Sequence, residues 1–254
     1  VSSIGVLTGK PVEFGGSLGR NEATGYGVAV TVREAAKKMG MDMTHAKIAV
    51  QGFGNVGAYT VKNIQKLGGT VVAVAEWAKE VGPYAIYKED GLDFQAMWDY
   101  RAEKGNLVDF PGSKMISMDE FWSAQVDVVV PAALENSIDA AVAEKIQAKL
   151  VCEAANGPTT PEGDEVLNSK GIILTPDILT NAGGVTVSFF EWVQNLYGYY
   201  WSEAEVEAKE DEAMVKAFEA LWAIKEEYGV TVREAAYMHS VKRVATAMKL
   251  RGWY

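Results

Sequence analysis

The sequence of 254 residues is poor in cysteine, histidine and basic side chains. The single cysteine, Cys152, cannot form an internal disulfide, and His45 and His239 lie far apart, so neither a disulfide framework nor a Cys/His zinc site is expected. Lys and Arg number 24 against 34 Asp and Glu, which gives a formal net charge of −10. This acidic balance argues against nucleic acid or an anionic membrane surface as a partner.

Long apolar runs are lacking as well. No segment reaches the length of about 20 apolar residues that a membrane span needs, and the first residues do not follow the pattern of a signal peptide. We therefore expect a cytoplasmic protein. The chain starts with Val1 instead of Met, which favours a processed chain or a piece of a longer protein. Its 48% of apolar residues suffice for the core of one large domain or two small ones.

Proline is absent after Pro176, and apolar residues at helical spacing predict two long helices there, over 202–228 and about 231–249. Another helix is expected over 22–39. Between these helical ends, short runs rich in Val and Ile alternate with helix-compatible segments. The predicted strands are 46–51, 70–75, 126–130, 150–152 and 172–174. This alternation predicts an α/β fold of the Rossmann type, with a doubly wound, mostly parallel sheet and an additional C-terminal helical segment.

The stretch 82–122 interrupts this rhythm and contains a predicted helix at about 94–103, so we interpret it as an elaboration within the same domain. The most informative local pattern is the strand 48–50, a glycine-rich turn and a helix. The turn consists of Gly52, Phe53, Gly54, Asn55, Val56 and Gly57. This arrangement is typical of a dinucleotide site, in which the pyrophosphate lies on the N–H groups at the start of the helix. The alternative is that three glycines merely make a tight turn.

An acidic residue strengthens the dinucleotide interpretation. Glu76 ends the next predicted strand, about 20 residues beyond Gly57, where a carboxylate can accept hydrogen bonds from the adenosine ribose. A 2′-phosphate placed against Glu76 would be repelled by about 4 kcal/mol per charge pair at about 4 Å, before solvent screening, so NAD is expected over NADP. Lys79 can soften that discrimination. Trp77 can line the adenine pocket, although packing is the more common role of a lone Trp, and Glu76 itself can be an ordinary solvated acid.

Four further segments place small residues and amides at positions where an open α/β sheet binds ligands. Three of them are 15–28, 130–134 and 153–159, and the last two of these follow strands. The fourth is the start of a predicted helix at Asn181. Asn181 can cap that helix or face the site. Ser188 lies two turns into the same helix, where a serine more often stays on the helix surface or bonds back to its own helix.

The segments GGSLGRNEATGYGV, QGFGNVG, VVPAALEN, CEAANGPTTPEGDEVL and LTNAGGVTVSFFEW, in that order, resemble the coenzyme-binding domain of glutamate dehydrogenases over essentially the whole chain. The resemblance implies NAD-dependent oxidative deamination of L-glutamate to 2-oxoglutarate and ammonia, and the reverse reaction. It places the pyrophosphate at the glycine turn and the ribose at Glu76. Around the nicotinamide end it places Thr24, Asn55, Ala132, Ala133, Asn156 and Asn181. Ser188 matches a position that contacts the substrate side-chain carboxylate, with Thr8 and Arg20 at neighbouring substrate positions.

The sequence lacks the clustered Lys and Asp that would fix two carboxylates and move protons. In glutamate dehydrogenases these groups belong to a substrate domain that precedes the coenzyme domain. We therefore expect residues 1–254 to be one dinucleotide-binding domain, with an N-terminal helix and C-terminal helices from about 200, and without catalytic residues or a metal site of its own. The family is hexameric mainly through the other domain, so the isolated chain could be a monomer.

Two alternatives stay open. A dehydrogenase of the same superfamily acting on leucine or phenylalanine is one of them, although GGSLGR and the polar Ser188 favour glutamate. A module that senses NAD without catalysis is the other. The sequence upstream of Val1 would discriminate, because a substrate domain rich in Lys supports the enzyme.

Overall fold

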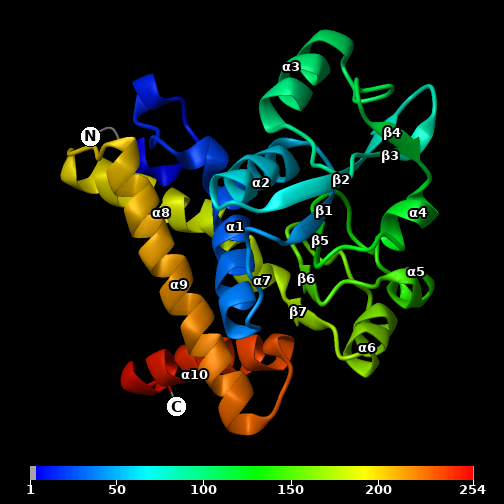
Figure 1. The fold of residues 1–254 in the computed structure, drawn as a ribbon. Coiled ribbons are helices and arrows are strands. Elements are labelled where there is room, and N and C mark those ends of the chain that lie inside the picture. Colours follow the sequence, from blue (N-terminus) through cyan, green and yellow to red (C-terminus); the bar gives the residue numbers. More distant parts are fainter. Residues whose placement is uncertain (1–3, 254) are drawn as a thin grey trace.

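A seven-stranded sheet forms the centre of the protein, which we describe over residues 4–253 of a computed structural model (Figure 1). Its strand order is β4-β3-β2-β1-β5-β6-β7. The strands are β1 (Lys47–Gln51), β2 (Thr70–Ala78), β3 (Gly82–Tyr87), β4 (Lys114–Ile116), β5 (Val128–Pro131), β6 (Leu150–Cys152) and β7 (Ile173–Thr175). All pairs are parallel except β2–β3 and β3–β4. The expected doubly wound, mostly parallel α/β sheet is thus confirmed, with its strand order reversing at β1.

The helices follow the predicted pattern closely. Before the sheet come two short 3₁₀ helices, Ile4–Val6 and Val12–Phe14, and helix α1 (Arg20–Lys38). Within the sheet region lie α2 (Asn55–Lys66), α3 (Phe94–Lys104), α4 (Met118–Trp122), α5 (Ala140–Lys145), α6 (Pro161–Ser169) and α7 (Asp177–Thr180). The last part of the chain is helical, as the absence of proline predicts, and comprises α8 (Ala182–Tyr197), α9 (Glu203–Tyr228) and α10 (Val232–Leu250). Capping boxes at Ser202 and Thr231 begin α9 and α10.

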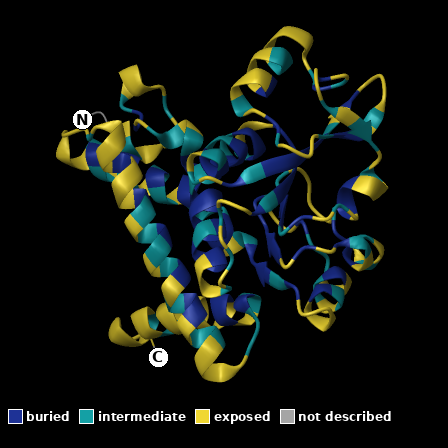
Figure 2. Ribbon diagram, viewed as in Figure 1, coloured by how far each residue is buried: buried dark blue, intermediate teal, exposed yellow. Residues whose placement is uncertain are grey.

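Helices cover both faces of the sheet, and successive strand residues serve opposite faces. Val50 belongs to the core cluster under α1, α2 and α9, whereas its neighbour Ala49 belongs to the cluster under α4, α5 and α6. Buried residues accordingly follow the strands and the inward sides of the helices (Figure 2). Cys152 at the end of β6 is fully buried, and this burial raises the pKa of its thiol to about 12.

The stretch 82–122 extends the sheet. Its strands β3 and β4 pair antiparallel beyond β2, and α3 lies between them in the chain. The pairing Glu76↔Tyr84 lengthens β2 to Ala78, so Glu76 lies within the strand and not at its end as predicted. The tight hairpin between β2 and β3 extends β2 beyond residue 75, where the apolar run in the sequence ends.

Helix α1 packs closely against α2 and α8 because two glycines face them. A Cβ atom added at Gly25 would lie 2.6 Å from the backbone N of Thr60 in α2. One added at Gly27 would lie 2.9 Å from the Cα of Gly183 in α8. These contacts place α8 and the start of α2 on either side of α1, next to the carboxyl ends of the central strands.

Within residues 4–253, no helix is long and apolar enough to cross a bilayer. The same part of the chain holds no group of three His, Cys, Asp or Glu side chains arranged for a metal ion.

Candidate functional site

The glycine turn connects β1 to α2 beside β2. Gly52 has a φ of 97°, which glycine tolerates best, and its N–H donates to the carbonyl of Ala75 at 2.7 Å. A Cβ atom at Gly57 would lie 2.0 Å from the carbonyl oxygen of Gly52. The fold itself therefore requires the first and the third glycine of the turn.

Gly54 is different, because the fold gives no reason for it. Its φ of −73° suits any residue, and a Cβ atom there would meet nothing within 4 Å. Gly54 is also the N-cap of α2, and no side chain of the described residues caps that helix start. The start of α2, with the partial positive charge of its first N–H groups, therefore has no capping side chain among the described residues and lies beside the open space at Gly54.

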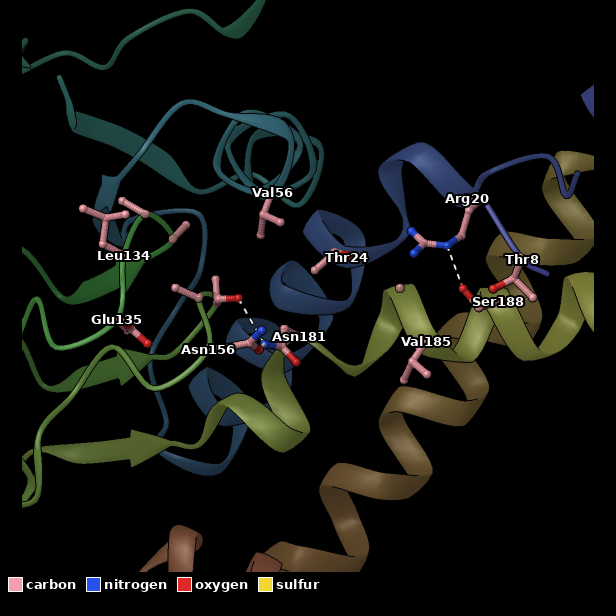
Figure 3. A pocket seen from close by; sticks show the side chains of 15 residues that line it. Thr8, Arg20, Thr24, Val56, Leu134, Glu135, Asn156, Asn181, Val185 and Ser188 are labelled. Carbon is pink, nitrogen blue, oxygen red and sulfur yellow. Dashed lines mark hydrogen bonds between the residues drawn. The ribbon is translucent and has the colours of Figure 1, made fainter. Parts of the chain in front are cut away.

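The other members of the turn divide between core and surface. Phe53 is buried, with its ring 6.3 Å from that of Phe94, so only its backbone can face a ligand. Asn55 is exposed at the start of α2, and Val56 points from α2 into a neighbouring cleft (Figure 3).

This cleft, of about 780 Å³, opens at the carboxyl ends of β5 and β6 and is bounded by α1 and α8 (Figure 3). The structure brings many of the predicted site residues together there, namely Thr8, Arg20, Thr24, Val56, Ala132, Ala133, Asn156, Asn181 and Ser188. The lining also contains residues that the sequence-based assignment had not singled out: Leu134, Glu135, Ala154, Ala155, Gly184 and Val185. Most of them lie in the strand-end segments already noted, so the signal was present but not resolved to single positions.

Three hydrogen bonds organise the polar side of the cleft, and two of them, between side chains, are drawn in Figure 3. The Nε of Arg20 on α1 donates to the Oγ of Ser188 on α8 at 2.9 Å. The Nδ2 of Asn181 donates to the Oδ1 of Asn156 at 2.7 Å and to the carbonyl of Ala154 at 3.3 Å. Asn181 thus occupies the N-cap position of α8, but its side chain faces the site and makes no capping hydrogen bond. Ser188 bonds to Arg20 of another helix.

The loop that carries Asn156 is fixed from behind by a buried carboxylate. Glu153 is fully buried, and it accepts hydrogen bonds from Arg233 of α10 at 2.7 Å and from the backbone N–H of Asp177 at 2.9 Å. Asp177 in turn accepts from the N–H of Gly157 at 2.8 Å. Because every oxygen has a partner, this network holds the end of β6 in one conformation.

Glu76 lies next to the glycine turn but outside the lining of the cleft. Its side chain is 9% exposed. Its Oε1 accepts a hydrogen bond from Nε of Arg101 at 2.9 Å and forms an ion pair with Nη2 of the same side chain, also at 2.9 Å. The Tyr84 hydroxyl donates to Oε2 at 3.5 Å, and burial together with Glu76 raises the pKa of Tyr84 to about 12. Trp77 is 64% exposed and, being the next residue in the strand, points away from the face that carries Glu76. Sequence reasoning missed Arg101, which nothing but its basic side chain would have marked.

The sequence and the fold match known proteins over nearly the whole chain. A family model described as Glutamate/Leucine/Phenylalanine/Valine dehydrogenase matches residues 15–252. The NAD-specific glutamate dehydrogenase of Clostridioides difficile is 76% identical over 253 residues, 100% of this chain and 60% of that protein. That of Peptoniphilus asaccharolyticus is 61% identical, over 99% of this chain and 60% of that protein.

Solved structures agree. The crystal structure of glutamate dehydrogenase from Peptoniphilus asaccharolyticus has a TM-score of 0.88 at 57% identity, over 98% of this chain and 58% of that one. The hetero-hexameric glutamate dehydrogenase from Thermus thermophilus in its Leu-bound form has a TM-score of 0.90 at 33% identity, over 99% and 58%. The chain thus spans about 60% of the length of the curated relatives it matches.

Proposed function

The chain belongs to the glutamate/leucine/phenylalanine/valine dehydrogenase family, and from this premise we propose that it is the coenzyme-binding part of an NAD-dependent glutamate dehydrogenase. Residues 1–254 form the coenzyme domain, and a substrate domain in the longer protein completes the enzyme. The reaction is the reversible oxidative deamination of L-glutamate to 2-oxoglutarate and ammonia. Two relatives described as NAD-specific glutamate dehydrogenases support this proposal. A relative described as hetero-hexameric supports a hexamer for the whole protein. We also propose that the protein is cytoplasmic.

The observation that carries the proposal is the open space at Gly54. Steric need explains Gly52 and Gly57, but the second glycine touches nothing, and the helix start beside it has no capping side chain among the described residues. A pyrophosphate fits there because it needs close approach to the backbone and accepts hydrogen bonds from free N–H groups. The alternative that the glycines only make a turn leaves Gly54 without explanation.

The cleft beside this turn suits the nicotinamide half of the coenzyme. NAD supplies the hydride acceptor of the reaction. Ala132 and Ala133 leave room for a flat ring at the end of β5, and the paired amides of Asn156 and Asn181 offer hydrogen bonds at its rim. The apolar Val56 and Val185 face the same space and help to exclude water from it.

The Arg20–Ser188 pair suits a carboxylate of the substrate. Because the Arg20 Nε already donates to the Ser188 oxygen, the hydroxyl proton of Ser188 is free to point to another acceptor. The remaining N–H groups of Arg20 can bind the same carboxylate. This polar pair favours glutamate over leucine or phenylalanine, whose side chains offer no acceptor to the Ser188 hydroxyl proton or to the remaining N–H groups of Arg20.

Fluorescence titration of the purified chain with NADH tests the coenzyme site. We expect NADH to bind, and Gly54→Val to raise its Kd at least about tenfold, since the added side chain occupies the space of the pyrophosphate. The control is Ala208→Val, which adds a similar bulk at an exposed position of α9 and should leave the Kd unchanged. Thermal melting of both variants verifies the fold.

Absence of NADH binding, or unaltered binding by a folded Gly54→Val variant, would overturn the proposal. A second titration with NADPH compares the coenzymes, and weaker binding of NADPH is expected.

A further inference from the structure

We propose that Arg101 is a specificity-determining residue, whose guanidinium limits how strongly the site rejects a coenzyme with a 2′-phosphate. This inference rests on the proposed function, namely that a dinucleotide binds at the glycine turn with its adenosine ribose at Glu76. It deepens that proposal because it assigns the degree of coenzyme preference to a residue outside the dinucleotide motif.

The first observation is the contact itself. Two nitrogen atoms of Arg101 lie 2.9 Å from Oε1 of Glu76, namely Nε, which donates a hydrogen bond, and Nη2, which completes the ion pair. The Glu76 side chain is nearly buried, whereas that of Arg101 is 39% exposed. A ligand that approaches Glu76 from solvent therefore meets the guanidinium as well as the carboxylate.

The second observation is that Arg101 is held in place by the fold. Helix α3 lies over α2 (Figure 1), and within α3 the rings of Phe94 and Trp98 are 5.6 Å apart. The Trp98 ring is also 5.7 Å from that of Tyr59 on α2. Arg101 lies about one helical turn beyond Trp98, on the same side of α3. Its charge is thus anchored near the glycine turn.

The third observation concerns the oxygens of Glu76 that remain available. Arg101 occupies Oε1, while among residues 4–253 the Oε2 atom has only the long 3.5 Å contact with the Tyr84 hydroxyl. Oε2 can therefore accept a hydrogen bond from a ribose hydroxyl. The pair stays compatible with NAD, because the carboxylate that would bind the ribose is oriented and not blocked by Arg101.

These contacts change the electrostatics expected from the sequence. A lone carboxylate would repel a 2′-phosphate, but Glu76 with Arg101 is a pair without net charge. One of the five N–H groups of the guanidinium, that of Nε, donates to Glu76, and the others can bond to phosphate oxygens. A 2′-phosphate at this place therefore meets attraction and repulsion together, and the preference for NAD is smaller than Glu76 alone would produce.

The test is a set of NADH and NADPH titrations with the same chain. In Arg101→Met we expect the ratio of the NADPH Kd to the NADH Kd to rise about fivefold at low salt, and less at high salt, as for a partly exposed charge. Arg101→Lys keeps the charge and should hold the ratio near that of the unaltered chain. Lys79 is the residue that the sequence alone marks as able to soften the discrimination, but in the structure the ion pair of Glu76 is with Arg101, and Lys79 is an exposed residue of the neighbouring hairpin. If Arg101 has this effect in place of Lys79, Lys79→Met should change the ratio little.

A further variant separates direct action from action through Glu76. In Glu76→Gln the ratio should fall, and adding Arg101→Met to it should raise the ratio again, because the guanidinium attracts the phosphate with or without the carboxylate. An unchanged ratio in Arg101→Met, an equal effect of Lys79→Met, or loss of the Arg101 effect in the Glu76→Gln background would each overturn the inference. If the unaltered chain binds neither coenzyme, both this inference and the proposed function fail. If it binds NADH and the ratio does not respond to Arg101, only this inference fails.

Discussion

Glu210 on α9 carries a buried carboxyl oxygen without a hydrogen-bond partner among the described residues. Its side chain is 2% exposed, and its Oε1 has no partner among the described residues. A Cβ atom added at Gly183 of α8 would lie 2.3 Å from that oxygen, which shows how tightly the two helices enclose it. Burial, reinforced by Glu207 and opposed by Arg20, raises the pKa of Glu210 to about 8.

The raised pKa of Glu210 predicts a pH-dependent stability. Between about pH 4.5 and pH 8 the folded state keeps this proton while the unfolded state has lost it, so the free energy of unfolding falls as pH rises, by up to about 1.4 kcal/mol per unit. Glu210→Gln should remove this slope and stabilise the chain most at alkaline pH. Urea unfolding at about pH 5, 7 and 9 measures the difference. Parallel pH curves for the two proteins would show that Glu210 carries no such penalty.

At this scale the sequence predicted much of the candidate site but not its pairings. Small residues and amides after strands marked Ala132, Asn156 and Asn181, because parallel strands end at one edge of the sheet. The partners of Glu76 and Ser188 depend on how helices distant in the chain pack together. No local pattern encodes the contact of Ser188 with Arg20 or of Glu76 with Arg101.

Helix α1 is the element on which the site depends, because it lies between α2 and α8 and brings Arg20 and Thr24 to the cleft. Gly25 lets α1 approach α2 until the backbones touch. Gly184 does the same for α8, since a Cβ atom there would lie 2.3 Å from the Thr24 hydroxyl oxygen.

Gly25→Ala tests this close packing. In an ordinary helix the change would stabilise by about 0.5–1 kcal/mol through backbone entropy. Here the methyl group would lie 2.6 Å from backbone atoms of α2, so we expect a net loss of about 1–3 kcal/mol in the free energy of unfolding. Urea denaturation decides the sign. A gain in stability would mean that α1 and α2 can separate without cost.

The elements themselves were largely predictable, since apolar runs and helical spacing locate all five parallel strands and the long helices within a few residues. The antiparallel strands β3 and β4 escaped prediction. β4 has only three residues, Lys114–Ile116, and β3 gains its strand character from pairing with β2. Tertiary pairing thus decided what the local sequence left open.

On the scale of the whole molecule, the cleft that we propose to bind the coenzyme has few charged side chains among its described lining residues. Among the lining residues, Arg20 is the basic side chain and Glu135 the acidic one, whereas oxidation of glutamate needs groups for two carboxylates and for proton transfer.

We therefore expect the 254-residue chain to bind NADH without turning over glutamate. Saturating NADH should raise the melting temperature, because about 100 times the Kd of ligand adds roughly 2.7 kcal/mol to the free energy of unfolding. Absorbance of NADH during incubation with NAD and glutamate measures turnover. Glutamate-dependent formation of NADH by this chain alone would contradict the expectation.

The buried thiol of Cys152 gives the molecule an internal reporter of its own opening. It ends β6, beside the strand-end loops that line the cleft, and burial keeps it protonated at neutral pH. A thiol reagent can reach it only when the sheet opens, so the labelling rate measures how often β6 separates from its neighbours. Because the chain has no second cysteine, this signal needs no engineered probe. Binding of a ligand that bridges the ends of β5 and β6 should slow the modification of Cys152, although the ligand does not contact its sulfur atom.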